Sequence, residues 1–323
     1  MIATRASTRQ SVAARLLALG GTIFLLAACA GGPGSVGPVI TRAPETNAPS
    51  DSPTGIPSSP PDGTPVPSDI PTQAPGSPGP TAAPTPAGTT DVKIYLLLGG
   101  QLVAVQRHVP QTVAVGRAAL EALIDGPATT ESALQTTVPS GTLVLGLVIK
   151  DGLATVDLSR EFEAGGGSAS MFGRLAQVVY TLTQFPTVDR VAFELDGEPV
   201  TVFSGEGIVL DHPSVRADYV SYLPPMFMDR PAWGGTATNP VRITGVANVF
   251  EATFLIEIRD AAGNSLAQRQ VMATCGSGCW GTFDVTIPYS IGSTQVGSVV
   301  VFNRSAKDGS VEDLIAYPVT LTP

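Results

Sequence analysis

Three acidic side chains lie close together in the sequence at Asp157, Glu161 and Glu163. A pair of carboxyl groups on either side of a sugar is what a glycosidase requires, one as the acid and one as the base or nucleophile. The surrounding segment is poor in the aromatic side chains that line a sugar-binding groove. Acids at the end of a strand also solvate a turn, so we expect these carboxylates to be surface groups without a catalytic role.

A nucleophilic serine needs a histidine beside it and usually lies on a strained turn such as Gly-x-Ser-x-Gly. The sequence has no serine in that setting, and its two histidines are His108 and His212. The sequence His212-Pro213-Ser214 is typical of a solvated linker. Walker, HExxH and EF-hand patterns are also missing from the sequence. We therefore predict a protein that is not an enzyme and uses no cofactor.

The chain begins with the parts of an export signal, which are three arginines, the apolar run Leu16–Ala28 and small residues before Cys29. The apolar run is shorter than the about 20 residues that span a bilayer. Leu26-Ala27-Ala28-Cys29 resembles a bacterial lipobox, in which the cysteine is lipidated and becomes the first residue. We predict a signal peptide over 1–28 and a lipid anchor on Cys29 that holds the chain on the extracytoplasmic face of the cell membrane. An uncleaved anchor and a plain secreted protein are the alternatives.

The remaining two cysteines lie four residues apart in Cys275-Gly-Ser-Gly-Cys279. In an oxidising exterior such a pair forms a disulfide, which for so short a loop stabilises the fold by about 2 kcal/mol. Half of a zinc site is the alternative, but zinc would need two more nitrogen or sulfur ligands, and both histidines lie in the preceding segment. We predict a disulfide and no metal.

The two tryptophans, Trp233 and Trp280, are candidates for contact with a partner. An exposed tryptophan on a rigid sandwich can stack on a glycan or dock a protein. For Trp280, the competing interpretation is that the side chain covers the edge of the core or the disulfide.

Residues 29–90 show no apolar period and are rich in Pro, Ser, Thr and Gly, which predicts a disordered linker. Its use would be to lift the folded part away from the membrane. The formal net charge is −9, and subtracting the three leader arginines leaves about −12. A chain that is acidic and has no basic cluster is repelled by nucleic acid, so we predict no nucleic-acid partner.

Residues 91–219 predict an α+β domain in the order ββα-ββα-β(β), with two helices on one sheet. Gly99-Gly100 and Asp151-Gly152 indicate hairpins. The apolar spacing predicts helices from Thr112 to Asp125 and from Ser168 to Phe185. Residues 222–323 show about seven short strands with turn signals between them and no helical period, which predicts an all-β sandwich of the immunoglobulin type.

Five motifs of the first domain together resemble the GerMN domain. They are Leu120-x2-Leu123-x2-Gly126-Pro127, Val138-Pro139-x-Gly141-Thr142, Ala154-x-Val156-Asp157-Leu158-Ser159-x2-Phe162, Thr181-Leu182-Thr183 and Val191-x-Phe193-x3-Gly197. The resemblance implies a fold like the ring-building motifs of sporulation and secretion complexes, and a role without catalysis.

The second domain resembles the immunoglobulin-like domain of bacterial spore germination proteins. The matching segments are Asn239-Pro240-Val241-x-Ile243-x-Gly245-x-Ala247-x-Val249-Phe250-Glu251-Ala252, Gly281-x-Phe283, Val301-Phe302 and Ser305-x2-Asp308-Gly309-Ser310. Together the two resemblances imply a scaffold or protein-interaction role in the cell envelope. We expect an envelope protein partner or self-association. Binding of peptidoglycan or another glycan is the alternative function, and a wall hydrolase is a third.

Overall fold

The structure, a computed structural model, describes residues 88–323. The predicted signal peptide, the lipid anchor on Cys29 and the predicted linker up to residue 87 lie outside the described residues. Over the range 88–323, no helix is long and apolar enough to cross a membrane.

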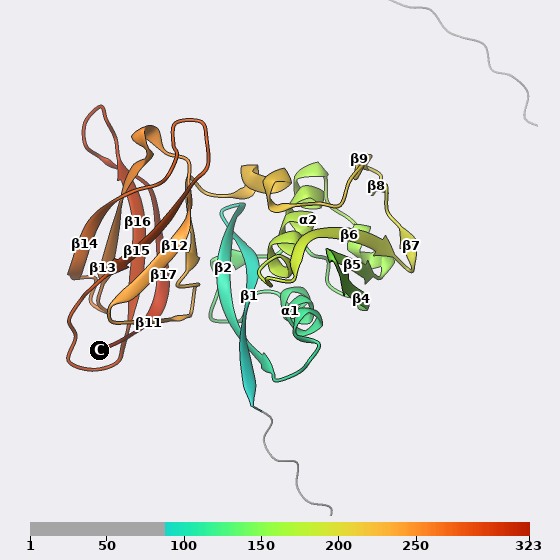
Figure 1. The fold of residues 1–323 in the computed structure, drawn as a ribbon, viewed down its shortest axis with the longest axis horizontal. Helices are drawn as coiled ribbons and strands as arrows, with labels where there is room; N and C mark the ends of the chain where they lie inside the picture. Colours follow the sequence, from blue (N-terminus) through green and yellow to red (C-terminus); the bar gives the residue numbers. More distant parts are fainter. Residues whose placement is uncertain (1–87) are drawn as a thin grey trace, which may run out of the picture. The chain divides into compact units, whose positions relative to one another are not determined.

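The first domain alternates hairpins with helices, in the predicted order (Figure 1). Its elements are β1 (Thr89–Leu98), β2 (Gln101–Pro110), α1 (Val115–Ile124), β3 (Leu134–Gln135), β4 (Val144–Lys150), β5 (Gly152–Leu158), the 3-10 helix η1 (Arg160–Glu163), α2 (Ser168–Leu182), β6 (Val188–Leu195), β7 (Glu198–Pro199), β8 (Val202–Phe203) and β9 (Ile208–Val209). The α+β class is confirmed, and both predicted hairpin turns have the positive φ values that their residues favour.

The prediction of one sheet under both helices is wrong. The strands of the first domain form separate sheets in the orders β2-β1-β3, β4-β5-β6-β7 and β8-β9. β5 and β6 are parallel, because the chain between them crosses over through α2. β1 pairs along its whole length with β2 but meets β3 at only two residues, Leu97 and Leu98. The first hairpin therefore does not extend the second sheet.

Both helices are shorter than their apolar spacing predicts. α1 begins at Val115, because the Thr112 hydroxyl accepts a hydrogen bond from the amide of Ala114 (3.1 Å) in a turn that precedes the helix. Val113, predicted on the buried face, is fully exposed as a result, whereas Leu120 and Leu123 are buried. α2 ends at Leu182, so the predicted last turn up to Phe185 is not helical.

The second domain is a sandwich of eight strands among the described residues, one more than predicted. They are β10 (Met226–Arg230), β11 (Thr236–Thr238), β12 (Val241–Ala247), β13 (Thr253–Arg259), β14 (Ser265–Met272), β15 (Gly281–Ile287), β16 (Gln295–Arg304) and β17 (Val311–Thr322), with a 3-10 turn η3 (Phe250–Ala252) before β13. One sheet has the order β10-β12-β15 and the other the order β11-β17-β16-β13-β14. Phe254 and Phe283 meet edge to face between the sheets, with ring centroids 5.0 Å apart. The predicted all-β class is confirmed.

The segment predicted as a solvated linker is instead packed against the first domain. The Ser214 amide donates to the Val191 carbonyl (2.7 Å) and the Val191 amide donates back to the Ser214 carbonyl (2.9 Å). The 3-10 helix η2 (Arg216–Tyr222) follows and contacts α2. A single cluster of buried apolar side chains then continues from the first domain into the second.

Candidate functional site: the junction between the two domains

A short backbone segment around Trp233 joins the two domains. The Gln106 amide donates to the Trp233 carbonyl (2.9 Å), and the Trp233 amide donates to the carbonyl of Ala104 (2.8 Å), both in β2. The next amide, of Gly234, donates to the Pro318 carbonyl in β17 (2.8 Å). Trp233 therefore follows β10 and is half-buried between β2 and β17.

A cluster of charged side chains lies at the same junction and draws on both domains. Lys93 of β1 forms an ion pair with Asp229 of β10, and the Tyr95 hydroxyl donates to the same carboxylate (2.6 Å). Arg216 of η2 donates to the Tyr95 oxygen (3.2 Å) and, through its Nε, to the hydroxyl of Thr183 (2.7 Å). One carboxylate therefore compensates two cations that come from different segments.

Burial and pairing oppose each other in this cluster. Burial alone would raise the pKa of Asp229, but the charge and hydrogen bond of Lys93, with the Tyr95 hydroxyl and Arg216, hold that pKa below its ordinary value. The pKa of Lys93 is also lowered, because the loss of solvation outweighs its attraction to Asp229. Burial raises the pKa of Tyr95 well above the ordinary tyrosine value. At neutral pH the junction therefore holds an ionised carboxylate and a neutral phenol.

Aromatic rings enclose the guanidinium of Arg216. Its carbon lies 4.7 Å from the Tyr180 ring centroid and 5.4 Å from that of Tyr95. Phe227 of β10 completes the group, with its centroid 6.0 Å from Tyr180 and 6.2 Å from Tyr95. Cation–π attraction between the guanidinium and these rings stabilises the arrangement, and more so where solvent is excluded.

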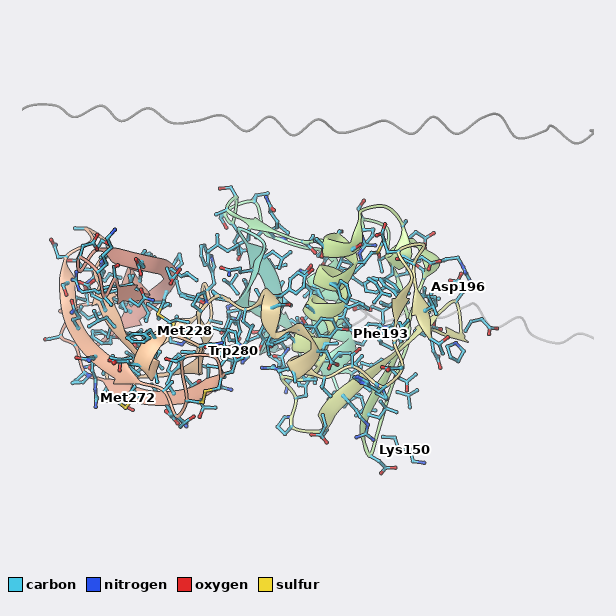
Figure 2. The ribbon with its side chains drawn as sticks, turned by 90° about the horizontal axis from the view of Figure 1, so that it is seen from above. Lys150, Phe193, Asp196, Met228, Met272 and Trp280 are labelled. Carbon is cyan, nitrogen blue, oxygen red and sulfur yellow. A yellow bond between two sulfur atoms is a disulfide. The ribbon has the colours of Figure 1, made fainter. Side chains whose placement is uncertain are left out.

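An open cavity of about 520 Å³ lies beside these rings. Its lining shares Tyr180, Arg216 and Phe227 with the cluster, and Trp280 of the second domain forms another part of it. Figure 2 shows Trp280 where the sandwich faces the first domain. A second cavity at the junction, about 560 Å³, has no aromatic side chain in its lining. The first cavity therefore has the aromatic and arginine composition that dominates protein-binding surfaces.

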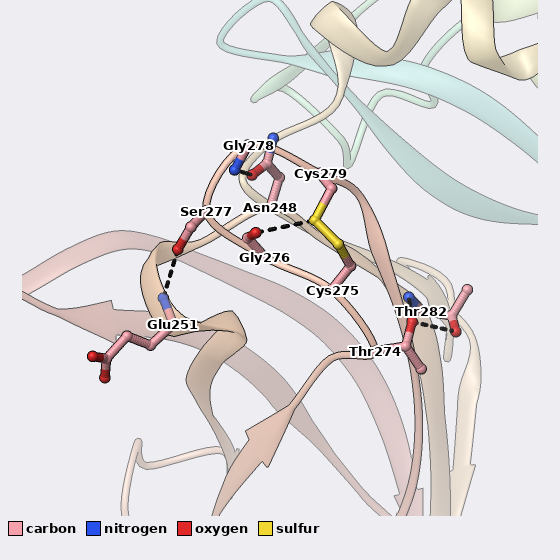
Figure 3. The surroundings of a disulfide bond; sticks show 9 residues. All are labelled: Asn248, Glu251, Thr274, Cys275, Gly276, Ser277, Gly278, Cys279 and Thr282. Atoms are coloured by element: carbon pink, nitrogen blue, oxygen red, sulfur yellow. Dashed lines mark hydrogen bonds between the residues drawn. A yellow bond between two sulfur atoms is a disulfide. The ribbon is translucent and has the colours of Figure 1, made fainter.

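The loop before Trp280 is held by a disulfide and by hydrogen bonds (Figure 3). Cys275 and Cys279 are joined, with their Cα atoms 5.8 Å apart. The Gly278 amide donates to the Asn248 side chain (2.9 Å), and the Ser277 hydroxyl accepts from the Glu251 amide (2.9 Å). The loop is thereby fixed to the turn before β13, which sets the position of Trp280.

The three carboxylates considered for glycoside hydrolysis, Asp157, Glu161 and Glu163, are not arranged for that reaction. Asp157 accepts a hydrogen bond from the Gly197 amide (2.9 Å) and so fixes a turn. Glu161 is exposed, and the hydroxyl of Ser159 lowers its pKa. A general acid needs a raised pKa, so the shift at Glu161 has the wrong sign for that role.

The histidines are not paired with a serine either. The Ser214 hydroxyl is bonded to the hydroxyl of Tyr219 (3.0 Å), whereas His212 Nδ1 contacts the Pro213 carbonyl (3.1 Å). The second histidine, His108, faces Asp91 on the surface (2.5 Å). Within residues 88–323, no group of three or more His, Cys, Asp or Glu side chains is placed to hold a metal ion.

Sequence reasoning named Trp280 as a candidate for partner contact, which stays a prediction, and it missed the charged cluster. Lys93 and Asp229 are separated by 136 residues, so their pairing has no local signature. The available signal was a charged residue directly beside buried apolar residues, in Val92-Lys93-Ile94 and in Met228-Asp229. A charge in such a place is buried only with a partner.

Comparison with known proteins agrees with this two-domain arrangement. Residues 93–201 match the family model described as Germane, sporulation and spore germination, and residues 227–310 match the immunoglobulin-like domain of bacterial spore germination. The chain therefore carries a Germane (GerMN) domain followed by a spore-germination immunoglobulin-like domain. Neither description names an enzyme.

The chain is similar to the spore germination protein GerM of Bacillus subtilis (strain 168). The two are 25% identical over 191 residues, which are 57% of this chain and 50% of GerM, so the chain spans about half the length of that relative. The solved first GerMN domain of that protein is 27% identical and covers 40% of this chain and all of its own, with a TM-score of 0.37. The tandem GerMN domains are 17% identical and cover 73% of this chain and 61% of their own, with a TM-score of 0.38.

Proposed function

We propose that this chain is a cell-envelope lipoprotein that acts without catalysis, as a scaffold or protein-interaction module. Its similarity to a spore germination protein and its two spore-germination domains support a role of this class. The lipobox-like sequence before Cys29 supports anchoring by lipid to the extracytoplasmic face of the membrane. One acyl chain holds a protein weakly and two hold it firmly, which the diacylglyceryl group of a lipoprotein would supply.

The cavity at the domain junction is the observation that carries the interaction role. Its walls come from both domains and combine Tyr180, Arg216, Phe227 and Trp280. Binding hot spots are enriched in tryptophan, tyrosine and arginine, and they lie in pockets from which water is excluded on binding. A partner that inserts an apolar side chain there would contact both domains at once.

Cross-linking in intact envelopes, followed by recovery of this chain, tests the interaction role. Wild type should recover a specific envelope protein, and Trp280→Ala should lose it. Phe250→Ala is the matched control, because Phe250 is 69% exposed on the same domain but does not line the cavity. Equal recovery by wild type and Trp280→Ala would exclude the cavity as the binding site.

The anchor is tested separately. Labelled palmitate should be incorporated by the wild-type chain and not by Cys29→Ala, and the native protein should partition into the detergent phase. A wild-type protein in the aqueous phase would refute lipid anchoring without bearing on the cavity.

A wall glycan is the second candidate ligand. The cavity places the Trp280 ring near Asp284 and Thr282, and an aromatic face with hydrogen-bonding groups at its rim suits a sugar. Sedimentation of the chain with purified cell wall decides this case, and no co-sedimentation excludes it.

A further inference from the structure

β4 is an edge strand whose apolar side chains lie in solvent. One side of β4 pairs with β5, and its other side has no strand partner among residues 88–323. Leu143, Leu145, Val148 and Ile149 are 60%, 46%, 64% and 40% exposed, and we call these four residues the β4 edge patch. An uncovered strand edge with apolar side chains is a surface that pairs with another chain.

The other strand edges of the first domain are short or covered. β2 is bridged to the Trp233 segment, and β3 and β7 have two residues each. Proteins usually protect an exposed edge with charges, prolines or bulges. β4 has one bulge between Val144 and Gly146, and its only charged residue is Lys150 at its end.

We infer that two copies of this chain pair through the β4 edge patch, with the β4 strands antiparallel about a two-fold axis at Leu147. The inference deepens the proposed interaction role and rests on it, since it assigns one partner of that role to a second copy of the chain. It uses a surface away from the junction cavity, because no member of the β4 edge patch lines that cavity.

Symmetry and the pairing of apolar side chains favour this register. A two-fold axis perpendicular to a continuous sheet requires one residue to lie opposite itself, because neighbouring residues point to opposite faces. An axis at Leu147 sets Leu145 opposite Ile149 and Val148 opposite Gly146. The pair Leu145–Ile149 is apolar on both strands, and the packing of such cross-strand pairs stabilises an antiparallel ladder. An axis at Val148 would instead set Leu145 opposite Asp151.

Charges at the ends of β4 agree with the same register. Lys150 and Asp151 form the tip of the β4–β5 hairpin, and Figure 2 shows Lys150 at its free end. At the other end of β4, Arg117 donates to the Val144 carbonyl (2.5 Å) and to Glu121 (2.8 Å). The axis at Leu147 sets Lys150 opposite Val144. Each charged tip then lies beside the Arg117–Glu121 pair of the other copy, with both signs available for pairing.

Cysteine cross-linking of the full chain in its own membrane tests the pairing. Two differently tagged copies are expressed together, one with Leu145→Cys and the other with Ile149→Cys, and a mild oxidant is added. Opposite residues of antiparallel strands lie within the Cα separation that a disulfide spans. The mixed pair should cross-link, and copies with Met272→Cys, which is 73% exposed on β14, should not.

Three results would overturn the inference. They are no cross-link in the mixed pair, a cross-link as strong for Met272→Cys, and a product joined to a different protein. None of these results removes the proposed interaction role, which is read out by the Trp280-dependent recovery of an envelope protein.

Discussion

The buried carboxylate of Asp229 gives the sharpest prediction. Asp229→Asn keeps the shape of the side chain but removes the charge that compensates Lys93 and Arg216. The Lys93 and Asp229 side chains are only 14% and 23% exposed. Removing one partner of a buried pair costs about 3–5 kcal/mol, mainly because the other charge stays buried without compensation. We expect the variant to lose about 3 kcal/mol of unfolding free energy at pH 7.

Chemical unfolding followed by tryptophan fluorescence measures this loss. The chain has two tryptophans, Trp233 and Trp280, and both lie at the junction, so their emission reports its opening. Asp284→Asn is the control, because Asp284 also binds an arginine, Arg242, but both side chains are exposed. The control should keep the wild-type midpoint. Lys93→Met in the Asp229→Asn background should recover part of the loss, because it removes a buried cation.

The pH dependence provides the refuting experiment. A carboxyl group whose pKa is lower in the folded state than in the unfolded state stabilises the fold above its unfolded pKa of about 3.9. That contribution is lost as the pH falls through the lowered pKa of the folded state. The difference in stability between wild type and Asp229→Asn should therefore be full at pH 7 and shrink below about pH 4. A difference that is absent at pH 7, or that does not change with pH, would refute the assignment.

Three further substitutions have defined outcomes. Arg174 is buried in α2 and its guanidinium donates to the carbonyls of three residues from 162 to 165, so Arg174→Lys should lower the thermal midpoint, with a loss of about 2 kcal/mol. Cys275→Ser should cost about 2 kcal/mol by releasing the short loop, and the emission of Trp280 should shift to the red. Gly245→Ala should destabilise strongly, because the added Cβ would overlap the Phe227 carbonyl; an unchanged melting curve would contradict the close packing of β10 and β12.

Local patterns predicted much of the fold because their causes are local. Gly99-Gly100 and Asp151-Gly152 adopt positive φ values, which favour glycine and aspartate, so the hairpins were visible in the sequence. The alternation in β13 is also local, and Phe254, Ile256 and Ile258 are all buried as predicted. The helix ends were less visible, because a hydroxyl such as that of Thr112 can bond within a preceding turn instead of capping the helix.

Features that depend on distant partners were not predicted. β10 is a short apolar segment that becomes a strand only by pairing with β12. Arg174 lies among the apolar positions of α2. The helix contains no acidic residue that would indicate a buried ion pair. Its partners are backbone carbonyls of the loop after β5, which a pattern of side chains does not reveal. The junction cavity likewise exists only after both domains have folded and met.

The Asp229 carboxylate interacts with cations of the first domain, which limits the exchange of either domain during evolution. Lys93 and Arg216 belong to the first part of the chain and Asp229 to the second. A recombination event that replaced the sandwich by another domain would leave Lys93 and Arg216 buried without a compensating charge. The replacing domain would have to supply its own acidic residue. Natural variation at these three positions should therefore be correlated, and the two halves should descend together as one unit.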